Sequence, residues 1–156
     1  MSEATENINA INGDISKNGG GILTFYVEDQ IYGIEIKYIT DIIEILPITA
    51  IPKVPKYIKG VFNLRGKVIP VMSIRERFGK EQIPYDSRTC IVVLEINDVS
   101  AGIIIDKVCE VANVSAKDIT SPPSFKSVNV NRFISNIVNA EDHVKLILDC
   151  NKLIFD

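Results

Sequence analysis

The sequence predicts an all-β protein built from small β-barrels, and three observations carry this prediction. Most apolar segments are short and rich in β-branched residues, and several alternate apolar with polar positions as half-buried strands do. Gly, Asn and Asp, which favour turns, separate these segments. Little of the chain shows the spacing of an amphipathic helix. About ten short strands fit barrels, because closing a sheet removes its exposed edges.

The first expected elements form a hairpin and a third strand. Residues 22–27 alternate apolar and polar side chains, and residues 32–36 do the same after a turn at Asp29-Gln30. Residues 42–46 predict another strand. Residues 47–59 contain Pro47, Pro52 and Pro55, and each proline lacks a backbone donor. We therefore expect a loop there rather than a central strand, with one helical turn near its end at Tyr57.

A second hairpin and a short helix follow. Residues 61–64 and 67–72 read as two strands joined at Arg65-Gly66, where Gly66 supplies the positive φ of a tight turn. Residues 74–78 predict a short helix that ends at Gly79. The polar segment 80–88 is then the expected junction between two similar subdomains.

A second set of short elements fills the rest of the chain. The hairpin turns are expected at Asn97-Asp98 and around residues 140–142, with a loop at Ser121-Pro122-Pro123. Residues 108–114 either continue the preceding strand or begin a new one. The expected strands are 89–96, 101–108, 133–138 and 144–148, and the expected terminal helix is 151–155.

Composition narrows the class of protein. The 156-residue chain has a net charge of −3, which gives it no overall electrostatic reason to bind nucleic acid or an anionic membrane. Residues 1–21 are polar, end in Gly19-Gly20-Gly21 and are expected to form a disordered tail. No secretory signal and no apolar run of membrane-spanning length is apparent. Cys90, Cys109 and Cys150 lack metal or disulfide spacing, so buried thiols in a reducing cytoplasm are expected.

Catalytic and metal-binding motifs are missing from the sequence. His143 is the only histidine and lies at an expected hairpin turn, without the nucleophile that a triad would require. No glycine-rich phosphate-binding motif occurs. The acid pair Glu141-Asp142 falls in a polar turn and is read as solvated. We therefore expect a protein that is not an enzyme and that carries no cofactor or metal.

One stretch departs from the acidic balance of the chain. Between Lys53 and Lys80 the basic residues are Lys56, Lys59, Arg65, Lys67, Arg75 and Arg77. The stretch suggests either a solvated face or a patch for an acidic partner. Because small barrels also bind nucleic acid, a nucleic-acid-binding module remains an alternative, which a salt-dependent gel shift would support. The lack of interleaved surface aromatics argues against it.

Residues 51–71 carry a resemblance to a known family. The run Ile58-Lys59-Gly60-Val61-Phe62-Asn63-Leu64-Arg65-Gly66 followed by Val68-Ile69-Pro70-Val71 resembles the signature of CheW-like domains, and Asn63, Leu64, Arg65 and Gly66 form its motif. Residues 32–36 and the run Ala101-Gly102-Ile103-Ile104-Ile105-Asp106-Lys107-Val108 also resemble family segments. The resemblance implies that residues 22–156 form a single CheW-like domain of two SH3-like five-stranded barrels packed on a shared hydrophobic core.

The resemblance also implies a function and a site. Members of this family are adaptors that couple chemoreceptor cytoplasmic tips to the regulatory domain of the histidine kinase CheA, in the cytoplasm, at membrane-associated arrays. Alternatively, the chain serves another chemosensory-like pathway, such as one that governs pili or gliding. Kinase contacts are expected on the edges of the two barrels, with no direct membrane contact and no nucleic acid. Receptor-binding positions carry over to Ile39, Asp41, Arg65, Cys90, Gly102, Val108 and Val111, which would line a groove between the barrels; Asp41 replaces a glutamate and Cys90 a valine of the family pattern.

Overall fold

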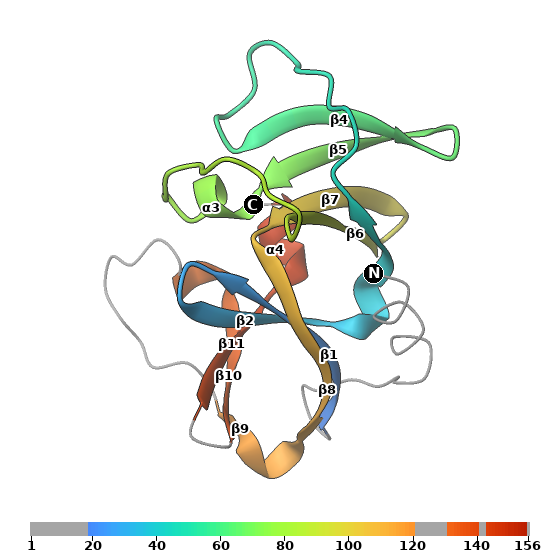
Figure 1. The fold of residues 1–156 in the computed structure, drawn as a ribbon. Helices are drawn as coiled ribbons and strands as arrows, with labels where there is room; N and C mark the ends of the chain where they lie inside the picture. The colour runs from blue at the N-terminus through green and yellow to red at the C-terminus, as the bar shows by residue number, and fades with distance from the viewer. Residues whose placement is uncertain (1–18, 121–130, 141–142, 156) are drawn as a thin grey trace.

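The computed structural model describes residues 19–120, 131–140 and 143–155. Within these ranges the chain forms eleven strands in two sheets, with short helical turns between them (Figure 1). The prediction of an all-β fold with two barrel-like subdomains is therefore confirmed.

The first sheet gathers both ends of the chain. It contains six strands because the two-residue β9 adds one to the expected five, and β2 and β11 are its parallel pair. In spatial order its strands are β8 (Lys107–Ser115), β1 (Gly19–Val27), β2 (Gln30–Glu35), β11 (His143–Leu148), β10 (Ile134–Ala140) and β9 (Ile119–Thr120).

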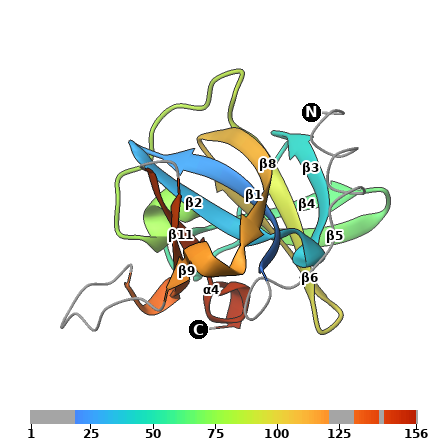
Figure 2. The same cartoon turned by 90° about the horizontal axis from the view of Figure 1, so that it is seen from below.

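The second sheet is built from the middle of the chain and has five strands. Its parallel pair is formed by β5 and β7. In spatial order its strands are β3 (Ile39–Glu44), β6 (Cys90–Ile96), β7 (Val99–Ile105), β5 (Lys67–Ser73) and β4 (Ile58–Leu64). Figure 1 shows this sheet above the first one, and Figure 2 shows the two from below.

The chain passes from one sheet to the other and back again. The hairpin β1–β2 belongs to the six-stranded sheet, and the chain then crosses through the short helix η1 (Ile36–Tyr38) to β3 of the other sheet. The hairpin β6–β7 belongs to the five-stranded sheet, and the chain crosses back at Asp106 to β8. Each half of the sequence therefore contributes strands to both sheets.

The subdomain junction expected near 80–88 is wrong for this reason. The segment joins the helix α3 (Ile74–Arg77) to β6, and β6 lies in the same sheet as β5, which precedes α3. Its polar composition reflects exposure to solvent, and exposure does not reveal which sheet the following strand joins.

The expected boundary of the N-terminal tail is also wrong. β1 begins at Gly19, and Gly19-Gly20-Gly21 pair with residues 113–115 of β8. Glycine is depleted in strands, so the side-chain pattern gave no sign that these three residues form a strand. They belong to β1 because they pair with the backbone of β8. Residues 1–18 lie outside the described residues.

Several smaller expectations can be compared with the structure. The terminal helix is confirmed as α4 (Cys150–Phe155), and α3 ends before Gly79, whose φ is +78°. The helical turn expected near Tyr57 is wrong, because the chain there makes only a hydrogen-bonded turn before β4. Residues 108–114 belong to a new strand, β8. The loop at 121–123 and the turn residues 141–142 lie outside the described residues.

The core is organised by strand alternation. On β6, Val92 and Leu94 point into a core that both sheets share, while Ile91 and Val93 point into the separate core of the five-stranded sheet. On β1, Phe25 faces the shared core and Ile22 faces the core of the six-stranded sheet. Because successive side chains point to opposite faces, a strand between two cores needs an unbroken apolar run. The shared hydrophobic core is confirmed.

The cysteines follow this burial pattern only in part. Cys90 and Cys150 are buried, and burial raises the pKa of the Cys90 thiol to about 11. Cys109 is exposed on β8, so the expectation of buried thiols is wrong for this residue.

Candidate functional site

Arg65 lies at the tip of the β4–β5 hairpin, where the backbone is constrained. Arg65 and Gly66 form a two-residue turn with φ values of +53° and +85°, and the Gly66 N–H donates to Asn63 Oδ1 at 3.0 Å. Such turns match the twist of the strands and normally use Asn or Gly at the first position, because a Cβ disfavours positive φ. An arginine held there costs backbone energy, and backbone strain of this kind concentrates at functional positions.

Arg65 is paired with Asp41 on the edge strand β3. Arg65 Nη2 lies 3.0 Å from Asp41 Oδ1, and the exposed fractions of the two side chains are 72% and 19%. The structure thus brings together two of the predicted site residues, 24 positions apart in the sequence. An exposed ion pair contributes at most about 1 kcal/mol to folding, so its position is better explained by recognition than by stability.

A cavity of about 280 Å³ adjoins this ion pair. Strands β3, β6 and β7 and the β4–β5 hairpin line it, with Asp41 and Arg65 joined by Lys67 and Glu95. Lys67 Nζ is held by a 2.8 Å hydrogen bond to Ser100 Oγ. The cavity offers charges of both signs, so it suits a polar segment of a protein partner better than an apolar small molecule.

The apolar members of the predicted site lie on the edge strands of the two sheets. Ile39 is on β3, and Val108 and Val111 are on β8. All three are partly buried and pack against the shared core. They do not belong to the lining of the cavity beside Arg65. The structure therefore places the exposed part of the predicted site on two sheet edges.

Cys90 and Gly102 do not reach the surface. Cys90 is 2% exposed in the shared core, and Gly102 is buried on β7 between Val71 and Val93 of the neighbouring strands. They cannot line a surface groove in this structure, and any effect on binding passes through packing. A Cβ at Gly102 would lie 2.8 Å from Ile91 Cγ2 and 3.1 Å from Phe62 Cε1, so the strands pack too closely for a side chain.

The substitution Gly102→Ala should lower the free energy of unfolding by about 1–3 kcal/mol, because the added methyl overpacks the core around Ile91 and Phe62. Chemical denaturation measures this change. Binding of the receptor tips that the family resemblance implies should follow the folded fraction of the variant. Weaker capture by fully folded Gly102→Ala would instead show that Gly102 acts at the binding surface.

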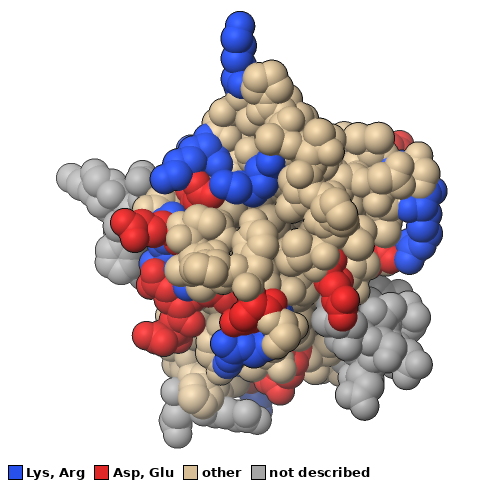
Figure 3. Space-filling model, turned by 45° about the horizontal axis from the view of Figure 1, so that its top comes forward, with Lys and Arg blue, Asp and Glu red and all other residues tan. Residues whose placement is uncertain are grey.

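The basic stretch does not form one open basic face. Lys56 and Lys59 pair with the buried carboxylate of Glu76, and Arg75 pairs with Asp106. Arg77 is buried, with its guanidinium over the rings of Tyr57 and Phe133. Figure 3 shows basic side chains separated by acidic and uncharged ones across the visible face. This interleaving removes the main argument for a nucleic-acid-binding surface.

The buried charges of α3 are a feature that the sequence did not reveal. Arg75, Glu76 and Arg77 are consecutive, and each is 9% exposed or less. A helix of four residues is too short to show an apolar periodicity, so nothing in the sequence distinguished these residues from a solvated charged run. Glu76 Oε2 is a buried oxygen without a hydrogen-bond partner among the described residues, 3.8 Å from Lys56 Nζ.

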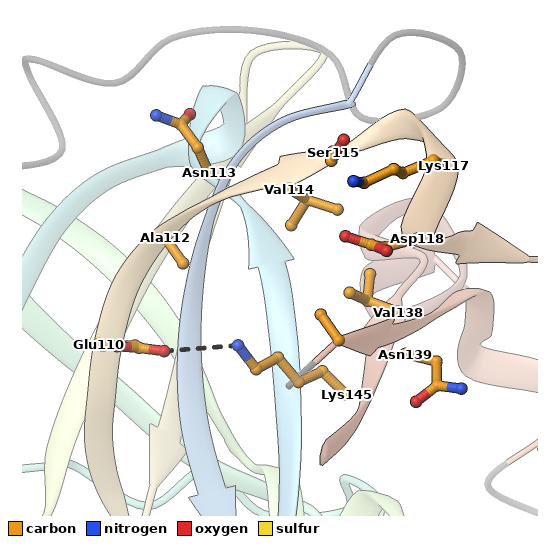
Figure 4. A pocket seen from close by; sticks show the side chains of 11 residues that line it. Glu110, Ala112, Asn113, Val114, Ser115, Lys117, Asp118, Val138, Asn139 and Lys145 are labelled. Carbon is orange, nitrogen blue, oxygen red and sulfur yellow. Dashed lines mark hydrogen bonds and ion pairs between the residues drawn. The ribbon is translucent and has the colours of Figure 1, made fainter. Parts of the chain in front are cut away.

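A larger cavity lies away from the Arg65–Asp41 pair. It has a volume of about 490 Å³ between β8, β10 and β11, and contains none of the predicted site residues (Figure 4). Glu110 and Lys145 form a 3.4 Å ion pair within it. No three His, Cys, Asp or Glu residues in the described ranges are grouped as a metal site would require. His143 is exposed at the start of β11.

None of the described helices is long and apolar enough to span a membrane.

The chain is similar to known proteins over most of its length. A family model described as "CheW-like domain" matches residues 21–156. The chain is 31% identical over 136 residues to a chemotaxis protein CheW of Treponema pallidum, covering 85% of this chain and 80% of the relative. It is 30% identical to the Bacillus subtilis chemotaxis protein CheW, covering 88% of each.

A solved structure is also similar. The scaffolding protein TtCheW of Thermoanaerobacter tengcongensis matches with a TM-score of 0.81 and 29% identity, over 90% of this chain and 94% of that chain. Family model, curated relatives and solved structure each match most of the chain, and this chain therefore belongs to the CheW-like domain family.

Proposed function

We propose that this chain is a chemotaxis adaptor that couples chemoreceptors to the histidine kinase CheA, with Arg65 at the receptor contact. The observation that carries the proposal is the exposed Arg65–Asp41 pair on a strained hairpin tip, within a chain of the CheW-like family. The relatives bear the names of chemotaxis and scaffolding proteins rather than enzymes. An adaptor of this kind works at membrane-associated receptor arrays without entering the membrane.

The receptor surface that we propose combines charge with apolar edges. Arg65 and Asp41 provide charges at the end of the five-stranded sheet. Ile39, Val108 and Val111 are partly buried apolar residues on the edge strands of both sheets. A helical partner with an apolar stripe and an acidic residue would match this combination, since amphipathic helices dock by such anchors.

A coupling protein must hold two partners at once, so their surfaces cannot overlap. On β5 and β7, Lys67 and Ser100 face the charged cavity, while the alternate residues Pro70 and Val99 line a second cavity of about 200 Å³. The full lining of this second cavity is Ile58, Pro70, Val71, Met72, Val99, Ala101, Ile154 and Phe155, all apolar. Strand alternation thus gives one sheet two different faces. We assign the apolar face to the kinase.

The substitution Val99→Asp should weaken capture of the CheA regulatory domain about tenfold, because it places a charge in the apolar cavity. Val99 is 40% exposed at the start of β7, so the protein should still fold. Co-sedimentation with receptor tips and kinase measures both captures in one experiment.

Receptor capture by Val99→Asp should remain unchanged. Val144→Asp is the matched control, since Val144 is 48% exposed on the other sheet. Equal kinase capture by Val99→Asp and wild type would exclude the apolar face as the kinase surface. A wild-type chain that captures neither partner would refute the adaptor function.

A further inference from the structure

The relative orientation of the two sheets depends on few connections. In the described part of the chain the backbone crosses between sheets at η1 and at Asp106. Most of the remaining contact is the shared apolar core, and hydrophobic packing is not directional. Arg77 of α3 adds hydrogen bonds to the carbonyl oxygens of Lys152 and Leu153 in α4, which follows β11. A directional interaction at a backbone crossing would add to this link and constrain how the sheets are aligned.

Arg75 makes such an interaction at the Asp106 crossing. Its Nε lies 2.9 Å from Asp106 Oδ1 and its Nη2 lies 2.7 Å from Asp106 Oδ2, which is the parallel fork geometry of a strong charge-assisted pair. Only 10% of the Arg75 side chain is exposed. The hydrogen bonds to Asp106 raise the pKa of Arg75 above its ordinary value. Arg75 thus remains charged and bound to this carboxylate.

The same arginine reaches the turn between β1 and β2. Arg75 Nη1 lies 3.6 Å from Glu28 Oε1, and the Glu28 N–H donates to Asp106 Oδ2 at 3.1 Å. Lys80 Nζ lies 3.2 Å from Glu28 Oε2. Arg75 extends from α3, which directly follows β5 of the five-stranded sheet, whereas Glu28 belongs to the hairpin of the six-stranded sheet. The network therefore ties the two sheets together through charged side chains.

This tie lies close to the proposed receptor surface. β8 begins one residue after Asp106, and Val108 pairs with Phe25 near the Glu28 turn. β8 starts at the crossing, so the crossing determines the positions of Val108 and Val111. Those positions are set relative to β3 of the other sheet, which carries Ile39 and Asp41. The position of Asp106 therefore couples the alignment of the sheets to the spacing of the receptor contacts.

We propose that Arg75 is a positioning residue for receptor binding: through Asp106 and Glu28 it holds the two sheets at the angle that aligns β8 with β3. The proposal rests on the adaptor function proposed above for its binding readout. Arg75 itself does not contact the receptor.

The test uses the full chain with Arg75→Lys. Lysine keeps the positive charge beside Asp106 and Glu28, so the variant should fold, but it cannot form the planar fork. Spin labels at the exposed positions Val68 on β5 and Val144 on β11 report the distance between the sheets, with Cys109→Ser removing the exposed native thiol. Arg75→Lys should broaden the distance distribution to about twice its wild-type width, because a single ammonium contact permits more orientations than a fork.

Binding supplies the second readout. Arg75→Lys should lower affinity for receptor tips about tenfold and leave capture of the kinase regulatory domain within about twofold, since six of the eight residues that line the proposed kinase cavity belong to the five-stranded sheet. Arg88→Lys is the matched control, because Arg88 forms a 3.0 Å pair with Asp86 on the surface of one loop. It should change neither readout.

Two results would overturn the proposal: an unchanged distance distribution in Arg75→Lys, or equal losses of receptor and kinase binding that follow the folded fraction. Failure of the adaptor function gives a different result. In that case the wild-type chain captures no receptor, while the distance measurement still reports whether Arg75 aligns the sheets.

Discussion

The substitution Arg65→Glu should weaken capture of receptor tips by about thirtyfold, corresponding to ~2 kcal/mol, while the protein remains folded. The reversal removes an anchoring charge and places a carboxylate beside Asp41, whose Oδ1 now lies 3.0 Å from Arg65 Nη2. Folding should change by less than about 1 kcal/mol, because the Arg65 side chain is 72% exposed. The backbone strain at φ +53° is the same for both side chains, since each carries a Cβ.

Titration of receptor tips, with thermal unfolding of the same sample, measures the two effects separately. The control is Arg88→Glu, because Arg88 is 64% exposed and forms an ion pair of the same 3.0 Å length with Asp86. It should bind receptor tips as wild type does. If Arg65→Glu and Arg88→Glu bind equally well, Arg65 is not a receptor contact and serves only its own turn.

The substitution Gly60→Ala should cause the largest loss of stability, about 3–5 kcal/mol, and Gly60 lies in the run 58–66 that resembles the family signature. A Cβ at Gly60 would lie 2.0 Å from the carbonyl oxygen of Thr49, and φ is +141°. The obstacle is backbone, because Thr49 and Val61 exchange hydrogen bonds of 2.8 and 2.9 Å. Relieving the clash would separate the loop that follows β3 from β4.

Gly66→Ala is the matched control for Gly60→Ala. Its φ is +85°, but no other atom lies within 4 Å of the place that a Cβ would occupy, so only the backbone preference of about 1 kcal/mol is lost. Urea unfolding of both variants gives the comparison. Equal losses would mean that the loop moves away at little cost and that close packing does not explain Gly60.

The local elements followed from side-chain pattern. Alternation in residues 22–27 and 32–36 predicted the β1–β2 hairpin, and Arg65-Gly66 predicted the β4–β5 turn, because both signals act between neighbouring residues. The pairing of β2 with β11 and of β5 with β7 was not predictable in this way. Parallel strands are distant in sequence, and the residues of one strand do not indicate which other strand pairs with it.

The candidate site, like the fold, was predicted from the sequence only in part. The motif located Arg65 in the sequence, and the resemblance supplied Asp41, whose pairing with Arg65 only the structure shows. Cys90 and Gly102 came with the same resemblance but are buried in the core. A family pattern records which positions matter and does not separate a contact residue from one that packs beneath it.

By itself the sequence determined that this is an all-β CheW-like domain, that two of its hairpins turn at Arg65-Gly66 and Asn97-Asp98, and which arginine its motif presents. Tertiary structure alone decided that each half of the chain enters both sheets, that Arg65 meets Asp41, and that Arg75 is buried against Asp106 between the sheets. The physical reason is the distance along the sequence between the residues that interact. Strand alternation and turn formation depend on adjacent residues, whereas burial and ion pairing of Arg75 depend on a carboxylate 31 positions away that the fold brings within 2.7 Å.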